Sequence, residues 1–117
     1  MRLPVWLGAA ALLACAAPGA QAHAILIASH PAVGGNVSAG KLGLWLRYNS
    51  RIDAARSCLI LTRPDHSQQA LAIAPSSPVD VLRSDVSLSP GAYVLRWQVL
   101  AVDGHITRGD VPFTVVP

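Results

Sequence analysis

The sequence predicts an all-β fold, either an antiparallel β-sandwich or a Greek-key barrel. After residue 23, short apolar runs alternate with turns rich in proline and glycine, a pattern typical of such folds. The 117 residues also contain no glutamate and one lysine, so the usual residues of exposed helical faces are missing. Beyond the N-terminal segment, no stretch of helical period reaches a useful length. A helical bundle and a coiled coil are therefore excluded.

The first 22 residues read as a cleaved secretory signal peptide. A basic start is followed by an apolar run over residues 3–17 and by Ala20-Gln21-Ala22, an A-x-A cleavage pattern. The apolar run is shorter than the about 20 residues that span a bilayer. The alternatives are an N-terminal membrane anchor and lipidation at Cys15. The sequence thus predicts a single exported domain over residues 23–117.

The expected strands follow one another along this domain. They are residues 24–29, 42–48, 58–62, 71–74, 79–82, 86–88, 93–102 and 111–116, of which 71–74, 79–82 and 86–88 are the weaker candidates. Residues 34–36 and 63–67 are expected to form turns, and Asn36-Val37-Ser38 is interpreted as turn chemistry and not as a glycosylation site. In the second strand, one face is wholly apolar; it consists of Leu42, Leu44, Leu46 and Tyr48.

Three aromatic residues are expected in the core. Trp45, Trp97 and Phe113 belong to three of the strongest apolar runs, and their default place is the inner face of the sandwich. Cys58 lies in the apolar run Cys58-Leu59-Ile60-Leu61 and is expected to be a small buried residue. It has no disulfide partner once Cys15 leaves with the signal peptide.

Charge and motifs exclude several function classes. Nine Lys and Arg stand against six Asp, a net charge of +3, and the basic residues are scattered. No nucleic-acid partner is therefore expected. The chain has no phosphate-binding loop, no nucleophile elbow and no CxxC pair.

The histidines carry the chemical signal. After cleavage, His23 is the first residue, and its α-amine and imidazole together can chelate one metal ion, Cu(II) in preference to Zn(II). Asp103-Gly104-His105 follows the longest apolar run and places a carboxylate and an imidazole two residues apart, where both can join that ion. An ordinary hairpin turn explains Asp-Gly-His equally well. His30 and His66 are expected to be solvated turn residues.

Two stretches resemble the CopC family of bacterial periplasmic copper-resistance proteins. One runs from His23-Ala24 to the Ser29-His30-Pro31-Ala32-Val33-Gly34 turn; the other comprises residues 91–99, Asp103-Gly104-His105, Gly109 and Phe113-Thr114-Val115. The resemblance implies a seven-stranded Greek-key β-sandwich or barrel of cupredoxin-like (Ig-like) topology. It also implies one Cu(II) ion per chain, bound by His23, Asp103 and His105.

The chain departs from the family pattern at two places. Tyr48-Asn49-Ser50-Arg51 stands where the family has an aromatic-Ser-Glu pattern, so any role of that acid is missing. Some family members carry a methionine-rich loop for Cu(I), whereas residues 64–80 contain no methionine. Thioether sulfur is the kind of ligand that Cu(I) prefers. The chain therefore resembles a Cu(II)-only type.

The expected function is that of a non-enzymatic, monomeric copper carrier or buffer of the periplasm, in copper homeostasis and resistance. It would pass its ion to a membrane or secreted partner, and the resemblance implies an inner-membrane protein of the CopD type. One alternative is a copper-dependent oxidase of the lytic polysaccharide monooxygenase type, which also has a chelating N-terminal histidine. The other is a metal-free Ig-like interaction module.

Overall fold

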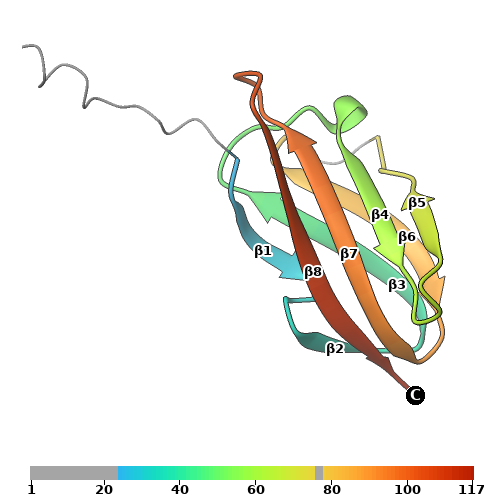
Figure 1. The fold of residues 1–117 in the computed structure, drawn as a ribbon. Coiled ribbons are helices and arrows are strands. Elements are labelled where there is room, and N and C mark those ends of the chain that lie inside the picture. The colour runs from blue at the N-terminus through green and yellow to red at the C-terminus, as the bar shows by residue number, and fades with distance from the viewer. Residues whose placement is uncertain (1–23, 76–77) are drawn as a thin grey trace, which may run out of the picture.

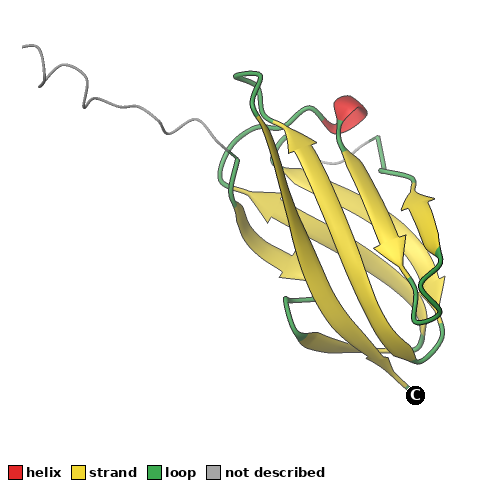
Figure 2. Cartoon of the chain, viewed as in Figure 1, coloured by secondary structure: helices red, strands yellow, loops and turns green. Residues whose placement is uncertain are grey.

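The computed structural model describes residues 24–75 and 78–117. The expected signal peptide, Cys15 and His23 lie outside the described residues. The domain is a sandwich of two β-sheets (Figures 1 and 2). One sheet has the order β1 (Leu26–His30), β3 (Gly40–Tyr48), β6 (Val81–Leu88). The other has the order β2 (Gly35–Ser38), β8 (Ile106–Val116), β7 (Gly91–Leu100), β4 (Cys58–Thr62), β5 (Gln68–Leu71). A single 3-10 turn, Ala54–Arg56, is the only helical element of the described part.

The all-β sandwich is confirmed, with eight strands where the resemblance implied seven. β2, which pairs in parallel with β8, was not among the expected strands. The predictions of a turn over residues 34–36 and of turn chemistry at Asn36-Val37-Ser38 were wrong, because Gly35–Ser38 form this strand. The turn comes earlier, where Gly35 N donates to Ala32 O at 2.8 Å and Gly34 takes a φ of +76°. Two predicted runs, 79–82 and 86–88, form one continuous strand, β6, because Arg83, Ser84 and Asp85 continue the pairing with β3.

The core lies between the sheets and follows the period of two. Leu42, Leu44, Leu46 and Tyr48 are all buried, as predicted. Trp97 and Phe113 are buried too, which confirms their place on the inner face. The Trp97 ring lies against Tyr48 edge to face, with ring centroids 5.2 Å apart.

Two core predictions are wrong for the same geometric reason. Trp45 alternates with Leu44 and Leu46, so it points to the outer face of the three-stranded sheet, where it is half-buried. Cys58 alternates with buried Leu59 and is exposed on the outer face of the five-stranded sheet, opposite Gln98. Each residue belongs to an apolar run, but only alternate residues of these strands face the core.

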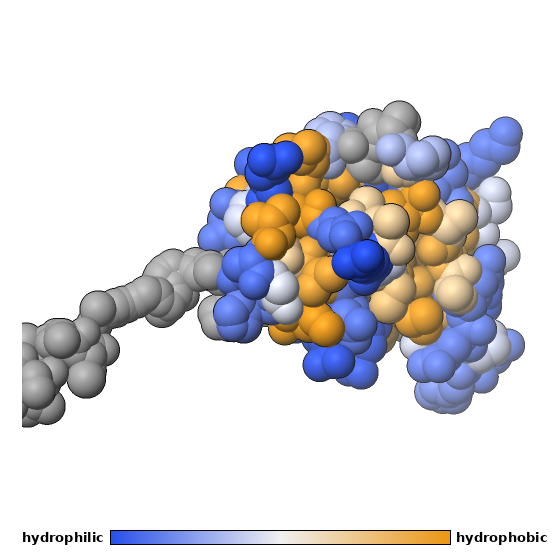
Figure 3. Space-filling view, turned by 90° about the horizontal axis from the view of Figure 1, so that it is seen from above, coloured by the Kyte–Doolittle hydropathy of each residue, from blue (hydrophilic) through white to orange (hydrophobic). Residues whose placement is uncertain are grey.

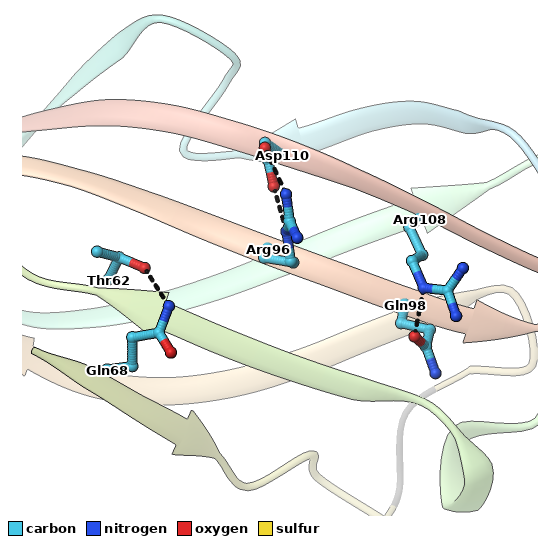
Figure 4. Close-up of polar contacts among 6 residues, drawn as sticks. All are labelled: Thr62, Gln68, Arg96, Gln98, Arg108 and Asp110. Carbon is cyan, nitrogen blue, oxygen red and sulfur yellow. Dashed lines mark hydrogen bonds and ion pairs between the residues drawn. The ribbon is translucent and has the colours of Figure 1, made fainter. Parts of the chain in front are cut away.

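Polar pairs cover part of the outer face of the five-stranded sheet (Figure 4). Arg96 Nε donates to Asp110 Oδ1 at 2.9 Å and Arg108 Nε donates to Gln98 Oε1 at 2.6 Å, each pair joining neighbouring strands β7 and β8. The hydrogen bond from Arg96, assisted by its charge, lowers the pKa of Asp110. This face is therefore a solvated surface with its charges in mutual contact.

Candidate metal centre

The Asp103-Gly104-His105 motif forms the hairpin between β7 and β8, at one end of the sandwich (Figure 1). Ala101 N donates to His105 O, and Gly104 N donates to Ala101 O, both at 2.9 Å. Gly104 has a φ of +91°, a conformation that favours glycine. The hairpin interpretation is therefore confirmed, and the same turn brings the two candidate ligands together.

Asp103 and His105 are in direct contact within this hairpin. Asp103 Oδ2 lies 2.7 Å from His105 Nδ1, and Asp103 Oδ1 accepts a hydrogen bond from the His105 backbone N–H at 3.1 Å. The backbone N–H, and then the imidazole, lower the pKa of Asp103. Two donor atoms held 2.7 Å apart can bind the same metal ion in place of the hydrogen that they share. The hairpin thus places a carboxylate oxygen and an imidazole nitrogen within reach of one ion.

The start of the described chain is tied to the same end of the sandwich. Thr107 Oγ1 donates to Ala24 O at 3.0 Å, although the two residues lie 83 positions apart. Ile25 N donates to the side-chain oxygen of Asn49 at 2.8 Å, and Asn49 N returns a bond to Ile25 O at 3.0 Å. Ala24, which follows His23 directly in the sequence, is therefore held by Thr107, two residues after His105.

Two of the three predicted ligands, Asp103 and His105, are thus brought together. The third, His23, lies outside the described residues. Within residues 24–75 and 78–117, no group of three His, Cys, Asp or Glu side chains is placed to hold a metal ion. His66 is exposed in the β4–β5 turn at the opposite end of the sandwich, and His30 is exposed at the end of β1. The turn prediction holds for His66, whereas His30 is the last residue of a strand.

Sequence reasoning missed Thr107 and Asn49, which hold the start of the chain beside the hairpin. A threonine in a strand and an asparagine after one carry no signal of their own, because such residues are common in both places. Their role is visible only once β1 and β8 are placed in space.

The hairpin is surrounded by exposed aliphatic side chains. Seen from this end of the sandwich, apolar groups occupy a large part of the surface (Figure 3). Ile25, Val102 and Ile106 are 58%, 66% and 50% exposed. His105 itself keeps 58% of its side-chain surface exposed. An ion bound here is accessible from outside the protein.

The fold and this end hairpin define a class, a cupredoxin-like β-sandwich with an aspartate–histidine pair at one end. The family model of the CopC domain matches residues 26–116, and the chain belongs to the CopC family. This confirms the resemblance seen in the sequence. In the part of the chain that the structure describes, no helix is long and apolar enough to cross a membrane.

Relatives and solved structures agree with this assignment. Protein YobA of Escherichia coli strain K12 is 30% identical over 102 residues, which cover 84% of this chain and 82% of YobA. The crystal structure of CopC from Methylosinus trichosporium OB3b superposes with a TM-score of 0.71 at 25% identity, over 81% of this chain and 95% of that one. PcoC, a methionine-rich copper resistance protein from Escherichia coli, superposes with a TM-score of 0.69 at 25% identity, over 81% of this chain and all of PcoC.

Proposed function

We propose that this protein binds one Cu(II) ion and carries or buffers it in the periplasm, without catalysing a reaction. The ligands are the α-amine and imidazole of His23, the imidazole of His105 and the carboxylate of Asp103. Nitrogen and carboxylate donors in this number suit the tetragonal plane that Cu(II) prefers. Cleavage of the signal peptide before His23 supplies the free amine.

The observation that carries the proposal is the geometry of the hairpin. The Asp103–His105 contact of 2.7 Å brings two of the proposed donors together, and the Thr107–Ala24 hydrogen bond holds Ala24 beside them. The relation to PcoC, a copper resistance protein, supports copper as the metal.

Carriage, as opposed to catalysis, is supported by two features of the site. Three nitrogens and a carboxylate fill a Cu(II) plane and leave little room for a substrate. The hairpin is exposed and bordered by aliphatic side chains, so a partner protein has direct access to the ion. The partner we propose is a copper-transport protein of the inner membrane, of the CopD type.

The decisive experiment alters the chain terminus. Two forms are titrated with Cu(II): the protein beginning at His23, verified by mass spectrometry, and the same protein with one alanine before His23. The added residue turns the amine into an amide, which is a poor metal donor, and leaves the imidazole unchanged. We expect Cu(II) affinity to weaken by at least about 100-fold, equivalent to about 2.7 kcal/mol.

Thermal unfolding of the copper-free forms is the control. The extension changes none of the residues that form the described strands, so both forms are expected to unfold at the same temperature. Equal Cu(II) affinity in the two forms would remove the amine from the site and return attention to lipidation at Cys15. Peroxide-dependent cleavage of a polysaccharide would favour the oxidase, and absence of stoichiometric copper binding would favour the interaction module.

A further inference from the structure

The outer face of the three-stranded sheet combines three cations with a half-buried tryptophan. Because side chains alternate along β3 and β6, this face receives the outward residues of both strands. Trp45 lies opposite Arg83 on β6 and opposite His30 on β1, and Arg47 lies two residues further along β3. Lys41, the only lysine, is at the other end of the same row. We call this surface the β3–β6 face; it consists of His30, Lys41, Gly43, Trp45, Arg47, Arg83, Asp85 and Ser87.

This face holds the net positive charge of the domain. It has three cations, Lys41, Arg47 and Arg83, and one carboxylate, Asp85. The remaining charged residues from position 24 onward balance one another: Arg51, Arg56, Arg63, Arg96 and Arg108 against Asp53, Asp65, Asp80, Asp103 and Asp110. The excess charge is therefore concentrated on one side of the sandwich.

The cations of the face are also available to a partner. In the described residues, none of the three forms an ion pair, and all three are exposed. The opposite sheet differs, since Arg96 is held by Asp110 and Arg108 by Gln98 (Figure 4). On the same face, a shallow hollow of about 450 Å³ is lined by Lys41, Asp85 and Ser87, because Gly43 contributes no side chain there.

We propose that the β3–β6 face docks on a bilayer of anionic phospholipids. Charge complementarity is the first argument, because each Lys or Arg near an anionic membrane strengthens binding roughly five-fold. Trp45 is the second, because an indole places its ring among lipid headgroups and its N–H in water. The cations are spread over a broad sheet face with one aromatic ring, which fits a membrane better than a stacked single strand of nucleic acid.

Docking in this way leaves the candidate copper site uncovered. The Asp103–His105 hairpin joins β7 and β8 of the other sheet, at the end of the sandwich. A domain lying on a membrane through the β3–β6 face keeps this hairpin open to a partner. The inference does not rest on the proposed copper function and is tested without copper.

The test is binding of the exported, leader-free protein to vesicles. Phosphatidylglycerol mixed with phosphatidylcholine provides the anionic surface, and pure phosphatidylcholine provides the neutral one. Co-sedimentation at low ionic strength is expected with the anionic vesicles only, and added salt should weaken it. The leader-free chain contains two tryptophans, Trp45 and Trp97, and Trp97 is buried in the core. A blue shift of fluorescence on binding therefore reports Trp45, and Trp45→Phe should abolish it.

A matched pair of double variants locates the surface. R47Q/R83Q removes two charges from the β3–β6 face and should weaken binding roughly 25-fold. R96Q/R108Q removes two exposed charges from the opposite sheet and should leave binding within about two-fold of the unaltered protein. Circular dichroism and thermal unfolding verify that all variants fold.

Four outcomes would overturn the proposal. The first is a lack of binding to the anionic vesicles at low salt. The second is an equal loss in both double variants, since net charge and not this face would then be responsible. The third is binding without a fluorescence shift. The fourth is tighter binding to soluble poly-aspartate than to the anionic vesicles, which would indicate an acidic protein as the occupant.

Discussion

At the candidate copper site, Asp103 is an acid whose pKa is lowered by its surroundings. Hydrogen bonds from the His105 backbone and imidazole lower its pKa, so it stays ionised well below neutral pH. Its charge is therefore present over the whole range in which imidazole and amine nitrogens take up protons. Loss of copper in mild acid should come from the nitrogen ligands and not from this carboxylate.

The pH dependence of copper binding tests this assignment. Affinity for Cu(II) should fall steeply as the pH drops below about 6.5, the ordinary value for imidazole. Asp103→Asn should weaken binding at pH 7 by roughly 10- to 100-fold, because it removes the negative charge that faces the ion, yet the pH of half-loss should hardly move. Titrations monitored by the Cu(II) absorption band give both quantities. An affinity that stays flat down to about pH 4 would exclude histidine ligation.

Two buried tyrosines should respond in opposite ways to loss of the hydroxyl. Tyr93 OH donates to Ser89 O at 2.7 Å and its ring stacks on Phe113, whereas the Tyr48 hydroxyl finds no partner among the described residues. Burial accordingly raises the pKa of Tyr48. Tyr93→Phe should lower the free energy of unfolding by about 1 kcal/mol, and Tyr48→Phe should leave it unchanged or raise it. Urea unfolding at pH 7 compares the two; a larger loss for Tyr48→Phe would show that its hydroxyl is satisfied.

At the scale of elements, the pairing of β7 with β8 depends on a glycine. Gly109 lies directly opposite Trp97, and the indole ring rests on its backbone. A Cβ at position 109 would lie 2.4 Å from Trp97 Cζ2 and 2.7 Å from Cε2. The ring has no room to retreat, because it also packs against Tyr48 in the core.

Gly109→Ala is therefore expected to destabilise the protein by about 1–3 kcal/mol, as overpacking of a core does. Gly43→Ala is the matched control, since Gly43 is an exposed strand glycine whose Cβ would meet only the end of the Asp85 side chain at 3.3 Å. That change should alter stability by less than about 1 kcal/mol. Thermal unfolding of both variants measures the two changes in stability. Equal losses would mean that the backbone conformation of glycine, and not the contact with Trp97, is responsible.

The strands also show why sequence patterns located some elements better than others. β3 and β4 were predicted closely, because every second residue of β3 from Leu42 to Tyr48 is apolar and a firm turn signal at residues 63–67 ends β4. β2 was missed because Gly35 and Asn36 are turn-forming residues in isolation. It is a strand because β8 offers it a free edge, where Gly35 to Ser38 pair with Phe113 to Val116. Edge pairing is a tertiary contact, and it outweighed local preference.

For the molecule as a whole, the supply of sulfur ligands limits the copper chemistry. Cys58 is the only sulfur-containing residue among those described, and it lies exposed on the outer face of the five-stranded sheet, opposite Gln98. The chain has no methionine after Met1. A site made of nitrogen and oxygen donors should hold Cu(II) well and Cu(I) poorly.

Reduction of the copper-loaded protein should accordingly release the metal. With ascorbate and a Cu(I) chelator present, transfer of copper to the chelator is expected to be complete, and Cys58→Ser should not change it. The absorbance of the chelator complex measures the release. Cu(I) that stays with the protein, and is lost in the Cys58→Ser variant, would contradict the Cu(II)-only assignment and identify Cys58 as a ligand.

The sequence by itself determined the all-β class and the CopC family, and it named all three candidate ligands. These follow from alternating apolar residues, turn signals and a short motif, all of which are local in the chain. Only the tertiary structure decided which face of its sheet each residue occupies, as Trp45 and Cys58 show. In an apolar strand, the alternation of side chains does not say which of the two alternating sets is buried until a second sheet covers one face. The hydrogen bond between Ala24 and Thr107, 83 positions apart, was likewise decided only by the tertiary structure, because packing in space and not proximity in sequence brings Ala24 to the hairpin.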